Sequence, residues 1–317
     1  MVAPTPAPGS WSVAATVRAS RALCQTFARH QLARGASRVF LFHDDPEMAC
    51  DIALPGVTST ICDGGWWRRG RPEALEQRQL HNATRAKGWC GTDWILHCDI
   101  DELIWSDSPI AEVLASVPPD VGGILVRPVE AVYAAPPDEG TIFHTPHFKR
   151  FFSPAGRPRA YRDISQRVYG ALWEATKYGF WGHILGKSFI RAAAPVGKMP
   201  LHGKKPDEIA GLKMRHHDDR LVLRHYDTLS LAQWKDKHLR RITGKVLVPQ
   251  AGKFRARQQQ LIAETLAREG EDGLDRLYLR MAVMPPELLA ESLEAGFVRI
   301  IPPEPHLAAP PAMPATQ

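Results

Sequence analysis

Short apolar runs alternate with amphipathic segments through the first half of the chain. Strands are predicted at Val13–Val17, Arg38–His43, Val57–Cys62, Trp94–Cys98 and Gly123–Val126, with helices between them at Ser20–Leu32, Pro72–Gly88 and Ser108–Val117. Strands separated by helices of about 10–15 residues are typical of βαβ units. The pattern therefore predicts an α/β fold with a mostly parallel sheet flanked by helices. Ligands of such sheets bind beyond the carboxyl ends of the strands.

The pattern changes in the second half. Residues 134–220 are rich in Pro, Gly, His and aromatic residues, which predicts long loops and short strands such as His183–Ile190. Helices are then predicted at Leu231–Thr243, Lys253–Glu269 and Pro286–Ala295, each directly followed by a glycine. We expect a disordered tail at 1–10, a main domain at 11–227, a helical C-terminal extension at 228–300 and a disordered Pro-rich tail at 301–317.

Composition narrows the class of protein. The chain has 317 residues, of which 44% are hydrophobic, and this is enough to bury a full core. No apolar run approaches the roughly 18–20 residues that span a bilayer. Met1–Ser10 has no basic residue before an apolar run, so no secretion signal is predicted. The five cysteines are odd in number and lack zinc-finger spacing, which argues against a disulfide framework and a structural zinc site. We expect a cytoplasmic protein.

The chain is basic, with a net charge of +6, and the basic residues are concentrated in one region. Lys198–Arg280 holds 18 Lys and Arg against 11 Asp and Glu. A basic face attracts polyanions such as nucleic acids, anionic lipid headgroups or nucleotide phosphates. Here the basic residues are mixed with acids along predicted helices, which favours ordinary solvated faces. The sequence has no recognisable nucleic-acid module, so we expect no nucleic-acid partner. Peripheral association with the inner face of the membrane stays open.

The sharpest chemical feature is an acidic motif at the end of a predicted strand. Asp99, Asp101 and Glu102 directly follow Trp94–Cys98 in the order Asp-Ile-Asp-Glu. Strand alternation places Asp99 and Asp101 on the same side of the chain. Mg²⁺ or Mn²⁺ is held by one or two carboxylates together with substrate phosphates. The motif therefore predicts a divalent-metal site, with an exposed acidic turn as the plain alternative.

This motif resembles that of family 2-type glycosyltransferases of the GT-A fold, in the bacterial branch with a D-x-D-E motif. The resemblance covers Val13 to Val132 in layout, and a later His225-Tyr226, followed by Trp234 and Lys237, also looks like that branch. It implies a GT-A, Rossmann-like fold and a nucleotide-sugar donor. It also implies Mn²⁺ or Mg²⁺ between the diphosphate and Asp101 with Asp99. The sugar would pass to a hydroxyl of a carbohydrate or lipid-linked acceptor, as in surface polysaccharide or glycoconjugate synthesis.

Other residues take roles in that scheme. Asp44 and Asp45 follow the second strand, at the position where acids of this fold meet the nucleobase or ribose, with an Asp-Pro turn as the alternative. Arg85 lies on the predicted helix before the metal strand and is a candidate for the diphosphate. His225 ends a strand-like run and is a candidate third metal ligand, with His202 as its competitor.

The general base is the least determined role. An acceptor hydroxyl is a poor nucleophile and needs a carboxylate within hydrogen-bond reach. Glu130 follows the strand Gly123–Val126 and is the first candidate, and Glu102 within the acidic motif is the second. Asp163 and Glu174 remain open. The sequence shows no clear counterpart of the acceptor-side Glu-Asp pair of inverting family 2 enzymes.

Two other functional classes remain open. A divalent-metal phosphate enzyme such as a nucleotidyltransferase has the same need for two carboxylates. It would be favoured by a Gly-rich basic phosphate loop near the first strand, of which Val17–Ser20 is only a faint version. The other class is a non-catalytic carbohydrate- or partner-binding protein on a degenerate transferase fold, which the intact Asp-Ile-Asp-Glu motif disfavours.

Overall fold

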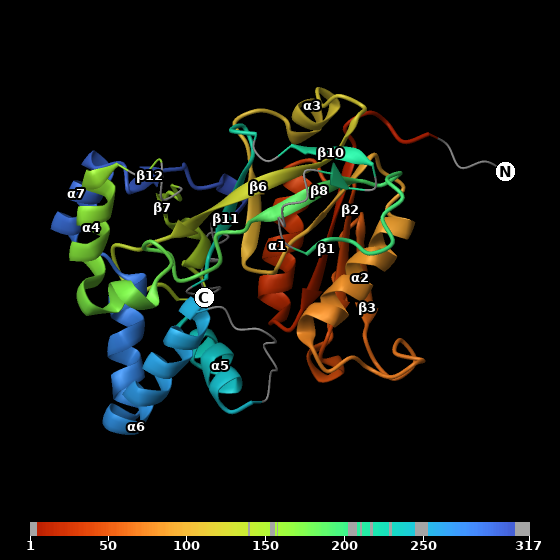
Figure 1. Cartoon of the computed structure of the whole chain (residues 1–317). Helices are drawn as coiled ribbons and strands as arrows, with labels where there is room; N and C mark the ends of the chain where they lie inside the picture. Colours follow the sequence, from red (N-terminus) through yellow and green to blue (C-terminus); the bar gives the residue numbers. More distant parts are fainter. Residues whose placement is uncertain are drawn as a thin grey trace, which may run out of the picture. The chain divides into compact units, whose positions relative to one another are not determined.

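The chain folds into two compact units, seen in a computed structural model (Figure 1). The structure describes residues 5–138, 140–152, 156, 158–201, 208–209, 211–215, 218–227, 230–244 and 253–307. Unit 1 holds the residues up to Pro128 and Ile184–His225, and unit 2 holds Val129–His183 and the described residues from Tyr226 onward. The boundary predicted at residue 227 lies within two residues of this division. Val129–His183, which we expected in the first domain, belongs to unit 2.

Unit 1 is built on a mixed sheet. Its parallel part runs in the order β4-β1-β2-β3 and consists of Trp94–His97, Trp11–Val17, Arg38–His43 and Val57–Ile61. Beyond β4 the sheet continues antiparallel, through β8 (Lys187–Arg191) to β6 (Val121–Ala131). The short strands β9 (Glu208–Ile209) and β10 (Leu212–Arg215) extend it from β6.

The α/β class is therefore confirmed, but the sheet is mixed where we expected it to be mostly parallel. The physical reason lies in how β8 reaches β4. Parallel neighbours need a crossover connection, usually a helix, whereas an antiparallel neighbour does not. β8 follows the loop-rich part of the chain and enters the sheet in the opposite direction to β4.

A second ladder in unit 1 pairs β5 (Glu102–Trp105) with β11 (Val222–His225) in antiparallel register. The register sets His225 opposite Glu102. Because β5 begins directly after the acidic motif, this ladder brings a histidine from much later in the chain to the motif.

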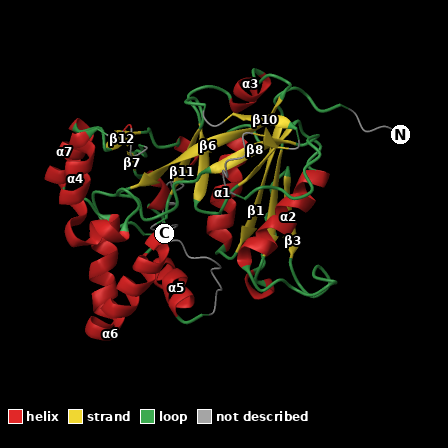
Figure 2. Cartoon of the chain, in the orientation of Figure 1, coloured by secondary structure: helices red, strands yellow, loops and turns green. Residues whose placement is uncertain are grey.

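Helices flank the parallel strands of unit 1 (Figure 2). They are α1 (Arg21–Ala33) and α2 (Leu75–Trp89), whereas the short α3 (Ile110–Ala115) is drawn beyond the upper end of the sheet. Ser20 caps α1 by accepting a hydrogen bond from the backbone N–H of Leu23, as its side chain and position favour. Phe42 of β2 packs in one core cluster with Ala83 and Ala86 of α2, so that α2 is fixed against the strands that end at the site.

Unit 2 combines a small antiparallel sheet with helices. The end of β6 pairs with β7 (His147–Lys149), which pairs with β12 (Val298–Ile300). The helices are α4 (Arg159–Tyr169), α5 (Leu231–Ile242), α6 (Lys253–Ala282) and α7 (Pro286–Glu294). The helix end predicted at Gly270 is a break inside α6, where Gly270 has φ +65°, and the chain then resumes a helix. Only glycine adopts this conformation without strain.

Four short 3₁₀ helices have bounds within the described chain. They are η1 (Pro46–Met48), η2 (Ile142–His144), η4 (Gly170–Ala175) and η5 (Pro305–Leu307). At the N-terminus, Ser10 donates a backbone hydrogen bond to Ala7, so regular contacts begin before the boundary predicted at residue 11.

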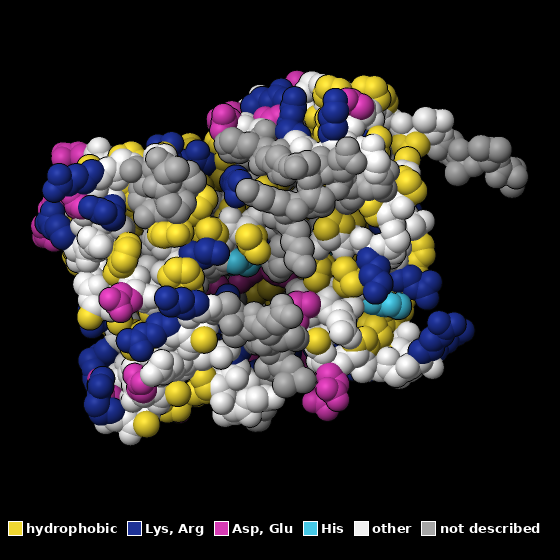
Figure 3. Space-filling model, viewed as in Figure 1, with side chains coloured by type: hydrophobic (Ala, Val, Ile, Leu, Met, Phe, Trp, Pro, Cys, Tyr) yellow, Lys and Arg dark blue, Asp and Glu magenta, His cyan; other side chains and the backbone are white. Residues whose placement is uncertain are grey.

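Two surface properties bear on partners. None of the described helices is long and apolar enough to span a membrane. On the face drawn in Figure 3, Lys and Arg side chains are interspersed with Asp and Glu side chains.

Candidate functional site

The acidic motif forms a tight turn between β4 and β5. The backbone N–H of Glu102 donates to the carbonyl of Asp99 at 3.1 Å, and the N–H of Asp99 donates to Glu102 Oε2 at 2.8 Å. These reciprocal bonds replace the extended conformation that we assumed in placing Asp99 and Asp101 on one side of a strand. Glu102 is fully buried. It therefore holds the turn in shape and does not face solvent.

Asp99 is held by two side chains from other elements. Its Oδ2 lies 2.8 Å from Nζ of Lys187 on β8, and its Oδ1 accepts a hydrogen bond from Nε2 of Gln79 on α2 at 2.7 Å. Lys187 is completely buried and also lies 3.5 Å from Oε2 of Glu102. Burial by itself lowers the pKa of Lys187, but Asp99 and Glu102 outweigh burial and raise it above the ordinary value. Lys187 is thus a buried cation that neutralises the motif.

Asp101 instead meets His225, the last residue of β11. His225 Nε2 lies 3.8 Å from Asp101 Oδ2, and the two residues are 4% and 8% exposed. A carboxylate and an imidazole at this separation are two of the ligand types that a divalent cation takes, and both lie in unit 1. Of the three predicted metal ligands, the structure thus brings His225 to Asp101, whereas Asp99 lies against Lys187 and Gln79. His202 lies outside the described residues.

A buried histidine, His97, precedes the acidic motif by two residues. His97, the last residue of β4, is 1% exposed. Burial, reinforced by the positive charge of Lys187, lowers the pKa of His97 to about 4. The imidazole therefore carries no charge at neutral pH, and Lys187 is the cation that balances Asp99 and Glu102.

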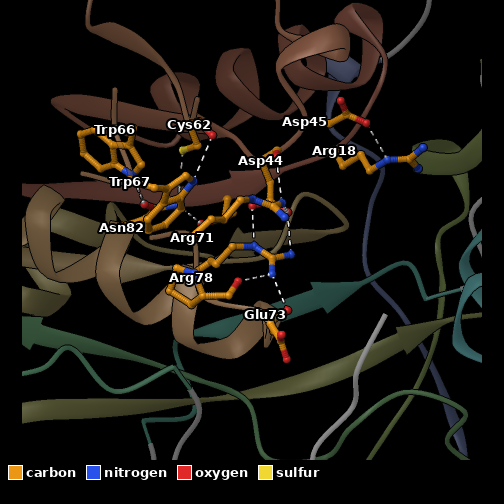
Figure 4. A network of polar contacts seen from close by, with 12 residues as sticks. Arg18, Asp44, Asp45, Cys62, Trp66, Trp67, Arg71, Glu73, Arg78 and Asn82 are labelled. Atoms are coloured by element: carbon orange, nitrogen blue, oxygen red, sulfur yellow. Dashed lines mark hydrogen bonds and ion pairs between the residues drawn. The ribbon is translucent and has the colours of Figure 1, made fainter. Parts of the chain in front are cut away.

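A second polar network lies where β2 ends (Figure 4). Arg78 of α2 binds Asp44 through two bonds, Nε to Oδ1 at 2.7 Å and Nη2 to Oδ2 at 2.8 Å. Arg71 lies 3.0 Å from the same carboxylate and leaves about half of its side chain exposed. Arg78 also donates to the carbonyls of Pro72 and Glu73, which fixes the start of α2. Asp44 thus positions two guanidinium groups at the edge of the sheet.

The two networks lie at the same edge of the parallel sheet. β1 lies between β2 and β4 and is parallel to both. Across the sheet, β2 and β4 are therefore two strand spacings apart, roughly 10 Å, and β2 ends three residues further along β1 than β4 does. A phosphorylated ligand at this edge would meet arginines at one end and the Asp101–His225 pair at the other.

Asp45 and Arg85 have local roles in the structure. Asp45 accepts a hydrogen bond from the N–H of Glu47 at 3.2 Å, which caps η1, and pairs with Nε of Arg18 at 3.1 Å. Arg85 lies with its guanidinium carbon 5.7 Å from the centre of the Trp66 ring (Figure 4 shows Trp66). The arginines that lie at the Asp44 carboxylate are Arg71 and Arg78, not Arg85. The sequence analysis did not select these two residues.

Glu130 lies in unit 2 and is 2% exposed. Its Oε1 is 2.5 Å from Nζ of the buried Lys149, and its oxygens also accept hydrogen bonds from the backbone N–H groups of Trp181 and Gly182. Lys149 donates further to the hydroxyl of Tyr169 at 2.6 Å. Three donors, one of them cationic, already occupy this carboxylate. Its role as general base stays a prediction without geometric support.

The two remaining base candidates, Asp163 and Glu174, lie at the surface of unit 2. Asp163 is about half exposed and pairs with Arg159 and Arg162, while Glu174 is exposed at the end of a 3₁₀ turn. Neither has a distinctive environment, so the structure singles out no base among the candidates.

Comparison with known proteins finds no matching protein-family model and no matching curated protein. The resemblance to glycosyltransferases thus rests on the residues quoted for it, and the site is described by its own geometry.

Proposed function

We propose that the chain is a metal-dependent glycosyltransferase that moves a sugar from a nucleotide-sugar donor to an acceptor hydroxyl. The observation that carries this proposal is the Asp101–His225 pair at the end of β4, with the Asp44–Arg71–Arg78 network at the end of β2. A nucleoside diphosphate has both the charge and the length to interact with these two places at once.

The donor set at the end of β4 fits a divalent cation. One carboxylate and one imidazole leave most coordination positions to water and phosphate oxygens, which is how Mg²⁺ and Mn²⁺ are usually held at phosphate-binding sites. Asp101 and His225 would hold the ion. When bound, such an ion stabilises the negative charge that develops on the departing diphosphate.

The protein's own residues orient this chemistry. Lys187 compensates Asp99 and Glu102, which keeps the turn closed and Asp101 in place. The half-exposed Arg71 offers a positive charge to a phosphate or a ribose hydroxyl while Asp44 holds it in position. Bidentate binding of phosphate by a guanidinium group is strong and directional.

The acceptor that we propose is a hydroxyl of a carbohydrate or a lipid-linked carbohydrate, and the compartment is the cytoplasm, including the inner face of the membrane. The acceptor follows from the resemblance, the cytoplasm from the odd number of cysteines without zinc-finger spacing, and the membrane face from the basic excess in Lys198–Arg280. The geometry of the site does not select among acceptors.

Calorimetric titration with UDP, GDP and nucleotide sugars, with and without Mn²⁺, tests the donor site. We expect binding that requires the metal and weakens at least tenfold in Asp101→Asn, which corresponds to about 1.4 kcal/mol. Asp120→Asn is the matched control, because Asp120 lies in the same unit, is exposed and pairs only with the exposed Lys213 in the ion pairs described. A folded wild-type protein that binds no nucleotide in the presence of metal would contradict the proposal. Nucleotide transfer in place of sugar transfer would favour a nucleotidyltransferase.

A further inference from the structure

Three side chains of unit 1 that are known ligand types for thiophilic metals gather near the end of β2. Cys24 lies on α1, His43 is the last residue of β2, and Cys50 follows η1. Their ligand atoms, two sulfurs and a ring nitrogen, all lie within 4.8 Å of one another. These residues are separate from the Asp101–His225 pair and have no part in the function proposed above.

One ring nitrogen of the buried histidine has no hydrogen-bond partner among the described residues. His43 is 2% exposed, and its ring makes a hydrogen bond to the backbone of Cys50. Its Nε2 is buried and has no hydrogen-bond partner among the residues that the structure describes. Metal-binding histidines typically donate one ring N–H to a backbone carbonyl, which leaves the lone pair of the other nitrogen for the metal. A buried polar atom with no partner is costly, and a bound cation would satisfy it.

The protonation states of His43 and Cys24 allow a metal ion to bind and displace the thiol proton. Burial lowers the pKa of His43, so its imidazole is neutral, as a ligand must be. Burial and the neighbouring Cys50 raise the pKa of Cys24 to about 12, so without a metal this thiol keeps its proton. On binding, each thiol S–H bond would break, a sulfur–metal bond would form, and the proton would pass to solvent.

We propose that Cys24, His43 and Cys50 form a binding site for a thiophilic divalent cation such as Zn²⁺. Zinc bonds of about 2.3 Å to sulfur and about 2.0 Å to nitrogen place tetrahedral ligand atoms roughly 3.5–3.8 Å apart. Any two of these ligand atoms therefore need to approach each other by no more than about 1.3 Å on binding. Cys50 lies in the irregular segment after η1 and is partly exposed, so it is the ligand that moves and the side from which the cation enters. Three protein ligands leave a fourth position for water or another small donor.

Cobalt titration of the reduced protein tests the site directly. Co²⁺ serves as the probe because thiolate ligation gives a charge-transfer absorption that carboxylate and imidazole ligation at Asp101 and His225 does not give. We expect this absorption to saturate at one equivalent, to disappear in Cys24→Ala and in Cys50→Ala, and to be displaced by Zn²⁺. Cys62→Ala is the matched control, because Cys62 is also buried and its pKa is also raised to about 12. Absence of the absorption in wild type, or its loss in Cys62→Ala as well, would overturn the proposal.

A second measurement needs no variant and so does not depend on variants folding. Alkylation of Cys50 by a maleimide, followed by mass spectrometry of the peptide, should slow at least tenfold on addition of Zn²⁺ and recover when a chelator is added. An alkylation rate of Cys50 that Zn²⁺ leaves unchanged would overturn the proposal. A Cys24–Cys50 disulfide that forms in air, in a protein that takes up no Co²⁺ after reduction, would do the same.

Discussion

Lys187 Nζ lies 2.8 Å from Asp99 Oδ2 and is completely buried. The acidic motif is therefore neutralised in part by a buried cation that comes from β8. The same ammonium group lies 3.5 Å from Glu102 Oε2. Of the three acids in the motif, two are thus compensated by Lys187, and Asp101 is the one that meets His225. This division assigns the three carboxylates different tasks: two shape the turn, and one is directed to the cation that we propose.

Replacing Lys187 tests the internal cation. We expect Lys187→Met to lower the free energy of unfolding by roughly 3–5 kcal/mol, because it leaves two carboxylates without their buried partner. Urea denaturation followed by circular dichroism measures this change. Lys213→Met is the matched control, since Lys213 forms an exposed pair with Asp120 and should leave the midpoint nearly unchanged. Equal midpoints for Lys187→Met and wild type would show that Lys187 does not compensate the motif.

Stability should depend on pH through His97. Its pKa is lowered from 6.5 to about 4 in the folded protein, so between these values the unfolded chain binds the proton and the folded protein does not. The free energy of unfolding contributed by His97 is therefore fully present above about pH 6.5 and is lost as the pH falls towards 4. At about 1.36 kcal/mol per pH unit, the loss is roughly 3 kcal/mol.

The measurement for His97 is a series of urea denaturations between pH 4 and pH 8, for wild type and His97→Gln. Carboxylates also titrate in this range, so the difference between the two proteins isolates the histidine. We expect His97→Gln to flatten the dependence, although its absolute stability will differ because a buried ring is removed. Parallel curves for the two proteins would contradict this assignment.

The parts of the fold that depend on local sequence were predictable. Arg38–His43 forms the strand that its short apolar run predicted, and Ser20 caps the helix that it was expected to begin. The antiparallel entry of β8 beside β4 was not predictable from local pattern. Strand direction depends on how the long loop-rich segment returns to the sheet, and no short window of sequence contains that information.

The site shows the same division between local and long-range information. Asp99 and Asp101 were visible as a motif, but Lys187 was not, because a single lysine in an apolar strand gives no signal until its partners are known. Buried polar residues on α2, namely Arg78 and Gln79, had one available signal: they lie on the face of the helix that the apolar pattern assigns to the core. The group of Cys24, His43 and Cys50 had no spacing signal, because its members come from three different elements.

His225 should contribute to metal affinity. We expect His225→Gln to weaken Mn²⁺ binding at least tenfold, measured as free Mn²⁺ by electron paramagnetic resonance, because an amide is a poorer ligand than an imidazole. His81→Gln is the matched control, since His81 lies in unit 1 against Trp66 and Trp67, away from the acidic motif in sequence and in its contacts. Equal Mn²⁺ affinities for His225→Gln and wild type would remove His225 from the ligand set.

Variants of Glu130 distinguish a structural role of this residue from a catalytic one. Its pairing with the buried Lys149 and with two backbone N–H groups predicts that Glu130→Gln lowers the free energy of unfolding by several kcal/mol, since an uncompensated lysine remains in the interior of unit 2. The double variant Glu130→Gln with Lys149→Met removes both charges and should recover part of this loss, as a double-mutant cycle would show. Thermal or urea denaturation of the three variants provides the stabilities, and a transfer assay on the folded fraction provides the activity. If Glu130→Gln were as stable as wild type and yet abolished sugar transfer, the buried ion pair would not be its role, and Glu130 would return as the general base.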